Sequence, residues 1–468
     1  MNNPRSNINP FAEYSHAMAS GPLYRRWGTV VRSRGLSIEV EGLNAGIGDM
    51  CRIASQDRSL QQMDGGLAEV IALSERGLTL MPYGDMTGIR KGDHVMLSAN
   101  ETQIAVGPEL LGRVVDAFGR AIDHGRPIAA KQVRALKAEP INPMVRPRID
   151  TILETGIRVI DGLLTLGCGQ RIGIFAGSGV GKSTLLGMLA KHVKNRRSAQ
   201  GRESVNIIAL IGERGREVRE FIEKQLGPEG LARSVVIVAT ADQPALTRVR
   251  ACYAALAIAE HFRDQNADVL LTMDSITRLA MARREIGLAS GEPPTARGYT
   301  PSVFAELPQI CERCGTAPSG GSISALFTVL VEGDDMNEPI ADSLRAILDG
   351  HIVLSRHIAH RGQYPAIDVL KSASRLMPDL VSKEQLQLAT STVNLMSLLE
   401  RNRQMVEIGA YTAGTNPALD DALSRDASLT KWLSQDVSGV PRDLAMQQLF
   451  KIIAPAESGP SVKGRSAP

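Results

Sequence analysis

The sequence has few cysteines, no long hydrophobic run and almost no excess of either charge, and each shortage excludes a class of protein. Five cysteines in 468 residues cannot form a disulfide framework, so we expect free thiols in reduced surroundings. No run approaches the roughly 18 consecutive apolar residues of a membrane-spanning helix, and residues 1–20 lack the apolar core of a secretory signal. The 53 basic and 50 acidic residues leave a net charge of +3, which argues against a whole-chain surface for nucleic acid or lipid. The expected compartment is the cytoplasm.

The composition is that of a folded chain with several parts. Hydrophobic residues at 43% and charged residues at 22% are ordinary for a globular protein. Residues 1–26 are rich in Asn, Ser and Pro, which predicts a flexible N-terminal arm with one short helix near residues 11–19. In residues 27–98 short β-type runs alternate with glycines, which predicts a small all-β barrel or sandwich, the barrel being our assignment. These runs lie at residues 28–31, 37–40, 67–73, 78–81 and 94–97.

Residues 99–376 are assigned to a second domain, in which, from about residue 146, apolar runs of strand length alternate with helical stretches. The runs are continuously apolar, as strands covered by helices on both faces require. They predict an α/β domain with a mainly parallel sheet, and they lie at residues 172–175, 205–211, 235–238, 269–273, 324–331 and 352–354. Residues 377–453 turn helical and predict a C-terminal helical domain, followed by a disordered tail at 454–468.

A glycine-rich segment directly follows the first of these apolar runs. Residues 176–184 read Ala-Gly-Ser-Gly-Val-Gly-Lys-Ser-Thr, and a helical stretch follows at 185–194. A strand, a glycine loop ending in Gly-Lys-Ser and then a helix form the context of a phosphate-binding loop. The loop N–H groups and the helix N-terminus bind phosphate, Lys182 adds a positive charge, and Ser183 offers a hydroxyl to Mg²⁺. The predicted nucleotide-binding residues are Gly177, Ser178, Gly179, Val180, Gly181, Lys182, Ser183 and Thr184.

One position departs from the usual pattern of this loop. Its first glycine is Ala176 here, so we expect Gly177 and Gly179 to supply the flexibility that the loop needs.

Two acidic residues lie just past the ends of predicted strands. Glu213 follows the run at 205–211, and Asp274 follows the run at 269–273. Ligands of open α/β sheets bind at the carboxyl ends of the strands, so three segments converge on one crevice. Asp274 suits a Mg²⁺ site, and Glu213 can orient the water that attacks the γ-phosphate. The simpler alternatives are a helix cap for Asp274 and an ion pair of Glu213 with Arg214 or Arg216.

At these residues the sequence resembles the catalytic ATPase of type III protein export, flagellar or injectisome. That family is itself similar to the catalytic β subunit of rotary ATP synthases. The resemblance is dense over about residues 100–435, and its motifs occur in the family's order. They are the glycine loop at 176–184, GERGRE at 212–217, LLTMDSITRL at 270–279, GEPPTARGYTPSVF at 291–304, EGDDMNEPIAD at 332–342, DGHIVLSR at 349–356 and YPAIDVLKSASR at 364–375.

The resemblance implies a RecA-like P-loop core with ATP and Mg²⁺ as cofactors. It implies that Lys182 and Ser183 hold phosphate and Mg²⁺, that Glu213 is the catalytic carboxylate, and that Asp274 lies on the Mg²⁺ side. The expected activity is hydrolysis of ATP to ADP and phosphate, coupled to protein unfolding and export.

Three further site residues rest on the resemblance. Arg214 resembles an arginine close to the γ-phosphate. Tyr364 occupies the position where the family stacks a tyrosine on adenine, and the alternative is a buried aromatic before Pro365. Arg375 occupies the position of an arginine finger that reaches into the neighbouring subunit, and the alternative is a cap or a surface ion pair. A finger acting in trans requires a ring, so the resemblance implies a homohexamer.

The resemblance also implies partners and a place in the cell. A negative regulator is expected on the N-terminal arm, together with contacts to export substrates, chaperones and the membrane export gate. The assembled ring would be peripheral at the cytoplasmic face of the inner membrane. No nucleic-acid partner is expected, because residues 27–98 offer only Trp27 and Tyr83 as aromatic platforms and no interleaved basic residues.

Several alternatives compete with this reading. A hexameric nucleic-acid translocase shares the nucleotide core, and so do the catalytic subunit of a rotary ATP synthase and a nucleotide-binding subunit without turnover. Nucleotide-binding subunits without turnover lack a carboxylate at the position of Glu213, so the presence of Glu213 argues for hydrolysis. Cys311 and Cys314 invite a metal or redox function, but with no second cysteine pair we expect two ordinary thiols one helical turn apart.

Overall fold

The computed structural model describes residues 27–55, 66–75, 77–195, 203–331, 333 and 335–454. The predicted N-terminal arm with its short helix, and residues 455–468 of the predicted tail, lie outside the described residues. None of the helices described combines the length and hydrophobicity needed to cross a membrane.

The chain divides between Thr102 and Gln103 into two compact units. This division falls four residues after the boundary predicted between residues 98 and 99. The short 3₁₀ turn Ala99–Thr102 stays with the first unit, because its Glu101 forms an ion pair with Arg52 at 2.5 Å. The limit predicted at residues 376 and 377, inside the second unit, stays a prediction.

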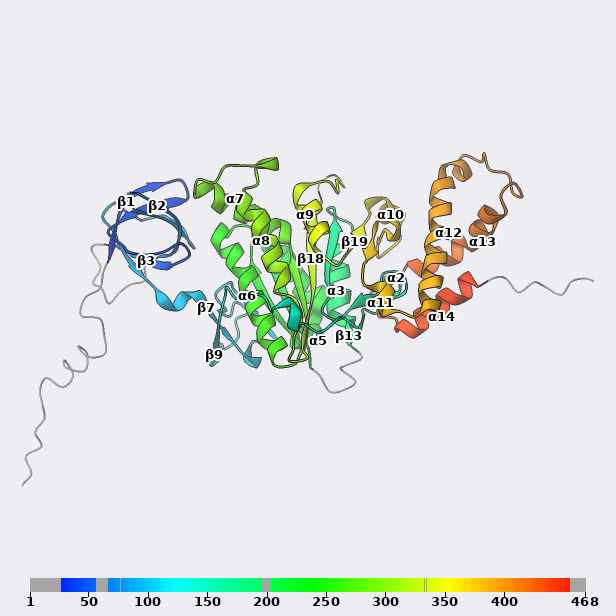
Figure 1. Ribbon diagram of the computed structural model, residues 1–468, viewed down its shortest axis with the longest axis horizontal. Coiled ribbons are helices and arrows are strands. Elements are labelled where there is room, and N and C mark those ends of the chain that lie inside the picture. Colours follow the sequence, from blue (N-terminus) through cyan, green and yellow to red (C-terminus); the bar gives the residue numbers. More distant parts are fainter. Residues whose placement is uncertain are drawn as a thin grey trace, which may run out of the picture. The chain divides into compact units, whose positions relative to one another are not determined.

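The first unit is a closed antiparallel barrel (Figure 1). Its alternating strands turn one face inward, and the side chains of Ile38, Val40, Val70, Leu80 and Val95 are fully buried. The predicted barrel is confirmed, but strand β3 was missed because four of its five residues are buried and leave no alternation. In barrel order the strands are β1 (Gly28–Arg34), β2 (Ser37–Glu41), β5 (Gly77–Pro82), β4 (Gly66–Ser74), β3 (Met50–Ala54) and β6 (His94–Leu97).

The second unit is built on a nine-stranded sheet, of which six neighbouring pairs run parallel. All six predicted runs are strands of this sheet, and the three-residue β8 was too short to show as a run. The order is β20 (Ala373–Ser374), β19 (Gly350–Leu354), β12 (Arg171–Ala176), β18 (Ser322–Leu330), β16 (Asp268–Asp274), β14 (Ser204–Ile211), β15 (Ser234–Ala239) and β8 (Arg113–Val115), with β17 (Gly315–Thr316) antiparallel to β18. Shorter strands pair beside it as β7 (Gln103–Val106) with β9 (Gln132–Ala135), and as β10 (Ile152–Glu154) with β11 (Leu166–Gly167) and β13 (Lys194–Asn195).

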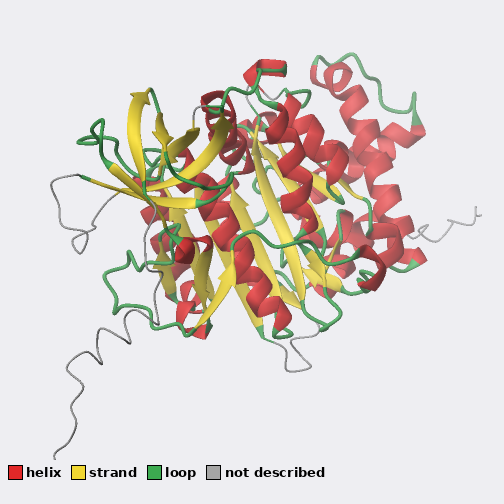
Figure 2. Ribbon diagram, turned by 60° about the vertical axis from the view of Figure 1, so that its left-hand side comes forward, coloured by secondary structure: helices red, strands yellow, loops and turns green. Residues whose placement is uncertain are grey.

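Helices enclose this sheet (Figure 2). The helix after the glycine loop ends at His192, and Lys194 already belongs to β13, so the predicted stretch at 185–194 was two residues too long. The helices are α2 (Arg158–Leu163), α3 (Lys182–His192), α4 (Gly215–Glu220) with a π-helical turn (Phe221–Leu226), α5 (Gly227–Ala232), α6 (Ala245–Asp264), α7 (Ile276–Ala289), α8 (Pro301–Glu312), α9 (Pro339–Ile347), α10 (Arg356–His360) and α11 (Met377–Leu380).

Three further helices follow, α12 (Lys383–Glu407), α13 (Pro417–Leu433) and α14 (Arg442–Ile453). Ser382 caps α12 by accepting from Gln385 N–H, and Asn416 caps α13 with Pro417 at its first position. The three helices group at one end of the second unit (Figure 1). Their buried side chains join one hydrophobic core with α2 and α3, so the predicted helical region packs directly on the α/β core.

Trp432 is the main anchor of this packing. It is 2% exposed, its Nε1–H donates to the Ala445 carbonyl at 3.1 Å, and its ring lies against Gly162 of α2 so closely that a Cβ there would be 2.8 Å from Cη2. A side chain larger than hydrogen at residue 162 would therefore displace the indole ring.

We expect Trp432→Ala to lower the free energy of unfolding of the second unit by about 3–5 kcal/mol, because it leaves a cavity where α2, α13 and α14 meet. Urea unfolding followed by circular dichroism measures this loss. Phe450→Ala is the matched control, because Phe450 is 61% exposed on α14 and its loss should cost less than about 0.5 kcal/mol. Equal losses in the two variants would contradict the anchoring role of Trp432.

Candidate functional site

The glycine loop connects β12 to α3, as the sequence predicts. Gly179 and Gly181 adopt positive φ angles of 78° and 87°, and Gly181 is the N-cap residue of α3. Gly177 is not among the residues with positive φ, so the backbone angles support the expected role of Gly179, and that of Gly177 stays a prediction. The left-handed backbone at residues 179 and 181 turns the chain into the helix N-terminus.

Lys182, Glu213 and Asp274 meet at the carboxyl edge of the sheet. Lys182 begins α3, Asp274 ends β16, and Glu213 follows β14 by two residues. Lys182 Nζ lies 2.5 Å from Asp274 Oδ1 and 3.3 Å from Glu213 Oε1. The predicted convergence of three distant segments is therefore present in the structure. The roles assigned to these side chains stay predictions.

Burial and charge act against one another in this cluster. Its side chains are 6–15% exposed. Burial opposes the charge on Lys182, but Asp274 and Glu213 outweigh it and raise the pKa of the ammonium. Burial also raises the pKa of the Glu213 carboxyl, and Asp274 adds to this effect while Lys182 opposes it. Lys182 is thus held charged, and Glu213 takes up a proton more readily than an ordinary glutamate does.

Asp274 is held from a second side. Thr328, on the neighbouring strand β18, donates its hydroxyl to Asp274 Oδ1 at 2.6 Å. The helix-cap alternative for Asp274 is wrong, because Ser275 caps α7 by accepting from the Arg278 N–H. The Asp274 side chain is left to face Lys182.

The ion-pair alternative for Glu213 finds no support in the contacts around it. Arg214 is 80% exposed and pairs with Glu217 at 3.5 Å, and Arg216 is exposed. Glu213 pairs with Lys182 across the crevice. The structure therefore brings Glu213 to the glycine loop but leaves Arg214 pointing to solvent.

Tyr364 lies beside the glycine loop. A Cβ placed on Gly181 would lie 3.4 Å from Cδ1 and Cε1 of the Tyr364 ring, which is 45% exposed. The alternative of a buried aromatic before Pro365 is therefore wrong. The ring borders a cavity of about 420 Å³, lined by Arg158, Gly362, Tyr364, Ser434, Gln435, Asp436 and Val440. This is space for a nucleotide base next to the predicted phosphate site.

Gln435 connects the segments around this cavity through hydrogen bonds. Its backbone N–H donates to the Tyr364 carbonyl at 2.7 Å, and its side-chain amide bonds Arg158 N–H at 2.9 Å and the Gly156 carbonyl at 2.8 Å. Gln435, two residues after the end of α13, thus holds both the backbone of Tyr364 and the start of α2. Sequence reasoning missed it, because a lone glutamine carries no pattern.

Arg375 follows the edge strand β20 and is exposed. Its guanidinium donates to the Arg345 carbonyl at 2.9 Å. Among the contacts of the described residues it makes none with Lys182, Glu213 or Asp274. The structure of one chain therefore does not bring Arg375 into the cluster, and its role in trans stays a prediction.

The donors at this edge fit Mg²⁺. Asp274 offers a carboxylate, and Ser183 is exposed at the first turn of α3. Mg²⁺ in nucleotide sites takes one or two protein oxygens and completes its shell with phosphate and water. In the part of the chain that the structure describes, no three His, Cys, Asp or Glu residues gather as a metal cage. All five cysteines are buried and free, and burial raises the pKa of the Cys314 thiol to about 12.

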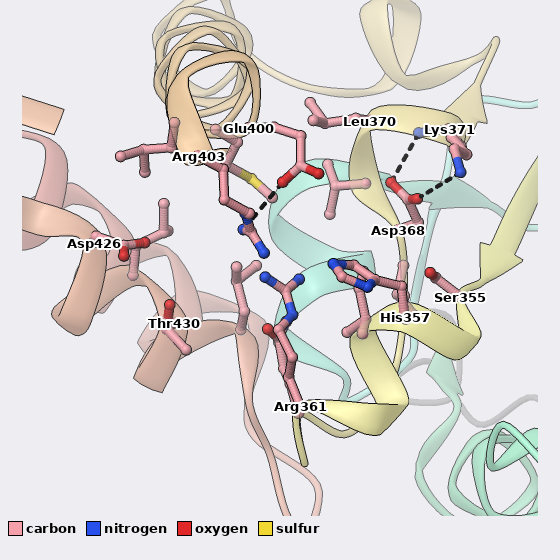
Figure 3. A pocket seen from close by; sticks show the side chains of 18 of the residues that line it. Ser355, His357, Arg361, Asp368, Leu370, Lys371, Glu400, Arg403, Asp426 and Thr430 are labelled. Atoms are coloured by element: carbon pink, nitrogen blue, oxygen red, sulfur yellow. Dashed lines mark hydrogen bonds and ion pairs between the residues drawn. The ribbon is translucent and has the colours of Figure 1, made fainter. Parts of the chain in front are cut away.

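A second cavity, of about 540 Å³, lies between the loops around α10 and the helices α12 and α13 (Figure 3). Arg361 and Arg403 point toward one another inside it. Arg403 pairs with Glu400 at 3.0 Å, and Lys371 pairs with Asp368 at 3.5 Å. None of the predicted site residues lines this cavity.

Sequence reasoning also missed two residues at the cluster itself. Arg278 lies four residues after Asp274, its side chain packs on Gly212, and its Nε is buried without a hydrogen-bond partner among the described residues. The short spacing between Arg278 and Asp274 is a local signal from which the sequence could have predicted that Arg278 lies near the cluster. Thr328 could not be found in this way, because the sequence does not say that β18 lies between β12 and β16.

Comparison with known proteins places this chain in a family. A model of the ATP synthase alpha/beta family, nucleotide-binding domain, matches residues 156–374, and a model of the T3SS EscN ATPase C-terminal domain matches residues 381–451. A flagellum-specific ATP synthase of Bacillus subtilis (strain 168) is 50% identical over 88% of this chain and 91% of its own length. A type 3 secretion system ATPase of Xanthomonas euvesicatoria is 46% identical over 88% of this chain and 90% of its own length.

Solved structures agree with these matches. The assembled ATPase EscN of the enteropathogenic E. coli type III secretion system aligns with a TM-score of 0.84 and 42% identity, over 91% of this chain and all of the EscN chain. EscN in complex with its central stalk EscO aligns with a TM-score of 0.82 and 41% identity over the same shares. Both family models and these relatives match one chain, so this protein belongs to the type III export ATPases, the family of flagellum-specific ATP synthases and type 3 secretion system ATPases.

Proposed function

We propose that this ATPase hydrolyses Mg²⁺-bound ATP in a homohexameric ring and powers protein unfolding and export through a flagellar type III apparatus. The observation that carries the proposal is the cluster of Lys182, Glu213 and Asp274 behind the glycine loop. The flagellar assignment is supported by the relative at 50% identity, which is a flagellum-specific ATP synthase. An injectisome is the alternative, as the EscN structures are also similar.

The cluster suits phosphoryl transfer because Lys182 can exchange its carboxylate partners for the phosphates of ATP. When phosphate enters the loop, Lys182 turns from the carboxylates to the phosphate oxygens, and the N–H groups at the start of α3 bind beside it. Bound Mg²⁺, held on the protein side by Ser183 and Asp274, would neutralise charge on the phosphates. Glu213, freed from Lys182, orients the attacking water toward the γ-phosphate.

The proposal also covers how adenine is bound and how neighbouring subunits of the hexamer contribute to the site. Tyr364 stacks on adenine in the cavity beside Gly181, and Arg375 and Arg214 contribute positive charge near the γ-phosphate, Arg375 from the neighbouring subunit. Support for a ring comes from the assembled state in which EscN was solved. Arg375 is exposed at a sheet edge, where a neighbouring subunit can reach it.

Partners and location follow from the same family membership. EscN binds a central stalk, EscO, and we extend a stalk partner to this chain. We also propose a negative regulator on residues 1–26, contacts with export substrates, chaperones and the export gate, and a place at the cytoplasmic face of the inner membrane. A rotary synthase subunit and a nucleic-acid translocase are disfavoured, because residues 381–451 match the export-type C-terminal domain.

We expect Glu213→Gln to bind ATP nearly as the parent does and to lose hydrolysis by at least about 100-fold, because the amide cannot accept a proton from water. Phosphate release and equilibrium binding of nucleotide measure the two effects. Glu223→Gln is the matched control, as Glu223 is 57% exposed and pairs only with Arg219 in the structure described. A Glu213→Gln variant that releases phosphate at the parental rate would remove Glu213 from the mechanism.

We expect Arg375→Ala subunits and Lys182→Ala subunits to have little activity alone and to regain part of it when they are mixed in one ring. If the arginine acts in trans, the intact Arg375 of a Lys182→Ala subunit completes the intact pocket of an Arg375→Ala neighbour, and such an arginine supplies about 10³- to 10⁵-fold in rate. Steady-state hydrolysis is measured across mixing ratios, with oligomer mass recorded for each mixture. Arg219→Ala, at a residue 81% exposed on α4, serves as the control and should keep the parental rate alone. Mixed rings that recover no activity would mean that each chain completes its own site.

A further inference from the structure

Thr328 is a buried hydroxyl at the centre of the site to which neither the sequence motifs nor the family comparison gives a role. It lies on β18, which runs between the strand that leads into the glycine loop and the strand that ends at Asp274. It pairs with Ile174 of β12 on one side, and Phe327 before it pairs with Met273 on the other. The side chain of Thr328 is fully buried.

The hydroxyl of Thr328 has one proton and two neighbouring acceptors. Its oxygen lies 2.6 Å from Asp274 Oδ1 and 3.3 Å from the Met273 carbonyl. The shorter contact is to a carboxylate, and hydrogen bonds to charged acceptors are shorter and stronger than those to neutral ones. The Thr328 hydroxyl therefore donates its hydrogen bond to the Asp274 carboxylate.

The same carboxylate oxygen also receives Lys182. Asp274 Oδ1 lies 2.5 Å from Lys182 Nζ, so in the structure described it has a cation and a hydroxyl as partners. These two partners differ in what happens to them during turnover. Lys182 sits on the glycine loop's helix and is drawn to phosphate, whereas Thr328 is fixed on a central strand and stays.

We propose that Thr328 is a positioning residue that holds the Asp274 carboxylate in place for Mg²⁺ once Lys182 has turned to the phosphates. The inference rests on the proposed function, because it needs Asp274 to lie on the Mg²⁺ side of a bound nucleotide. Without the hydroxyl, Lys182 is the one remaining side-chain partner of the Asp274 carboxylate among the residues described, and that partner leaves when the nucleotide arrives. Thr328 thus affects the metal-dependent part of nucleotide binding and leaves the metal-free part unchanged.

The test uses the full chain and a fluorescent ADP that carries an N-methylanthraniloyl group. Its dissociation constant is measured in EDTA and over a titration of MgCl₂ for the parent, Thr328→Val, Thr328→Ser and Asp274→Asn. Thr392→Val is the matched control, because Thr392 is equally buried and donates only to the Leu388 carbonyl within α12 in the described structure. Thermal midpoints without nucleotide are recorded for each variant.

We expect Thr328→Val to need about tenfold or more Mg²⁺ for half of the metal-dependent gain in affinity, as loss of a hydrogen bond to a charged group implies. Affinity in EDTA and the thermal midpoint should stay close to those of Thr392→Val. Thr328→Ser, which restores the hydroxyl, should behave as the parent does, and Asp274→Asn should exceed Thr328→Val in its effect.

Three results would overturn the inference. They are a Mg²⁺ midpoint of Thr328→Val within about twofold of the parent, an equal loss of affinity with and without Mg²⁺, and a Thr328→Ser variant as impaired as Thr328→Val. If Thr328→Val does not fold, the comparison of parent with Thr328→Ser and Thr328→Ala decides between hydroxyl and packing. Failure of the proposed function looks different, because the parent itself would then show no response to Mg²⁺ and no hydrolysis.

Discussion

The ion cluster around Lys182 is the interaction on which the rest of the site depends. A buried ammonium is tolerated only where opposite charge replaces the water that it has lost, and Asp274 and Glu213 supply that charge at 2.5 and 3.3 Å. Lys182 pairs with both carboxylates, so the cation offsets the repulsion between them. In the proposed mechanism the phosphates of a nucleotide replace the carboxylates as the partner of Lys182, so ligand binding is an exchange of partners within a site already formed.

The parallel sheet makes this cluster possible and also limits it. Its strands present their carboxyl ends at one edge, so that a loop, a strand end and a turn from three parts of the chain face one another there. β18 lies between β12, which leads into the glycine loop, and β16, which ends at Asp274, and its Thr328 donates a hydrogen bond to the Asp274 carboxylate. Thr328 is held on a central strand, whereas Lys182, Glu213 and Asp274 stand at the edge of the sheet.

The helical region is part of the same structural unit as the nucleotide site. The segment after α13 lines the cavity beside Tyr364 through Gln435, and the helix before it anchors the hydrophobic core through Trp432. Gln435 lies three residues after Trp432, so the cavity beside Tyr364 and the packing of α13 against α2 involve one short segment of the chain. The change in sequence pattern after residue 376 suggests a separate helical domain. In the structure this region shares one hydrophobic core with α2 and α3 and belongs to the second unit.

Much of the fold and the phosphate site could be predicted from the sequence, because continuous apolar runs, glycine punctuation and the Gly-Lys-Ser ending are local signals. Glu213 and Asp274 were predictable as well, since their places at strand ends follow from chain order. The sequence could not reveal Thr328 or Gln435, whose contacts join residues 54 and 277 positions apart. Strand order and the docking of the last helices decided those contacts, because tertiary packing chooses which distant segments become neighbours.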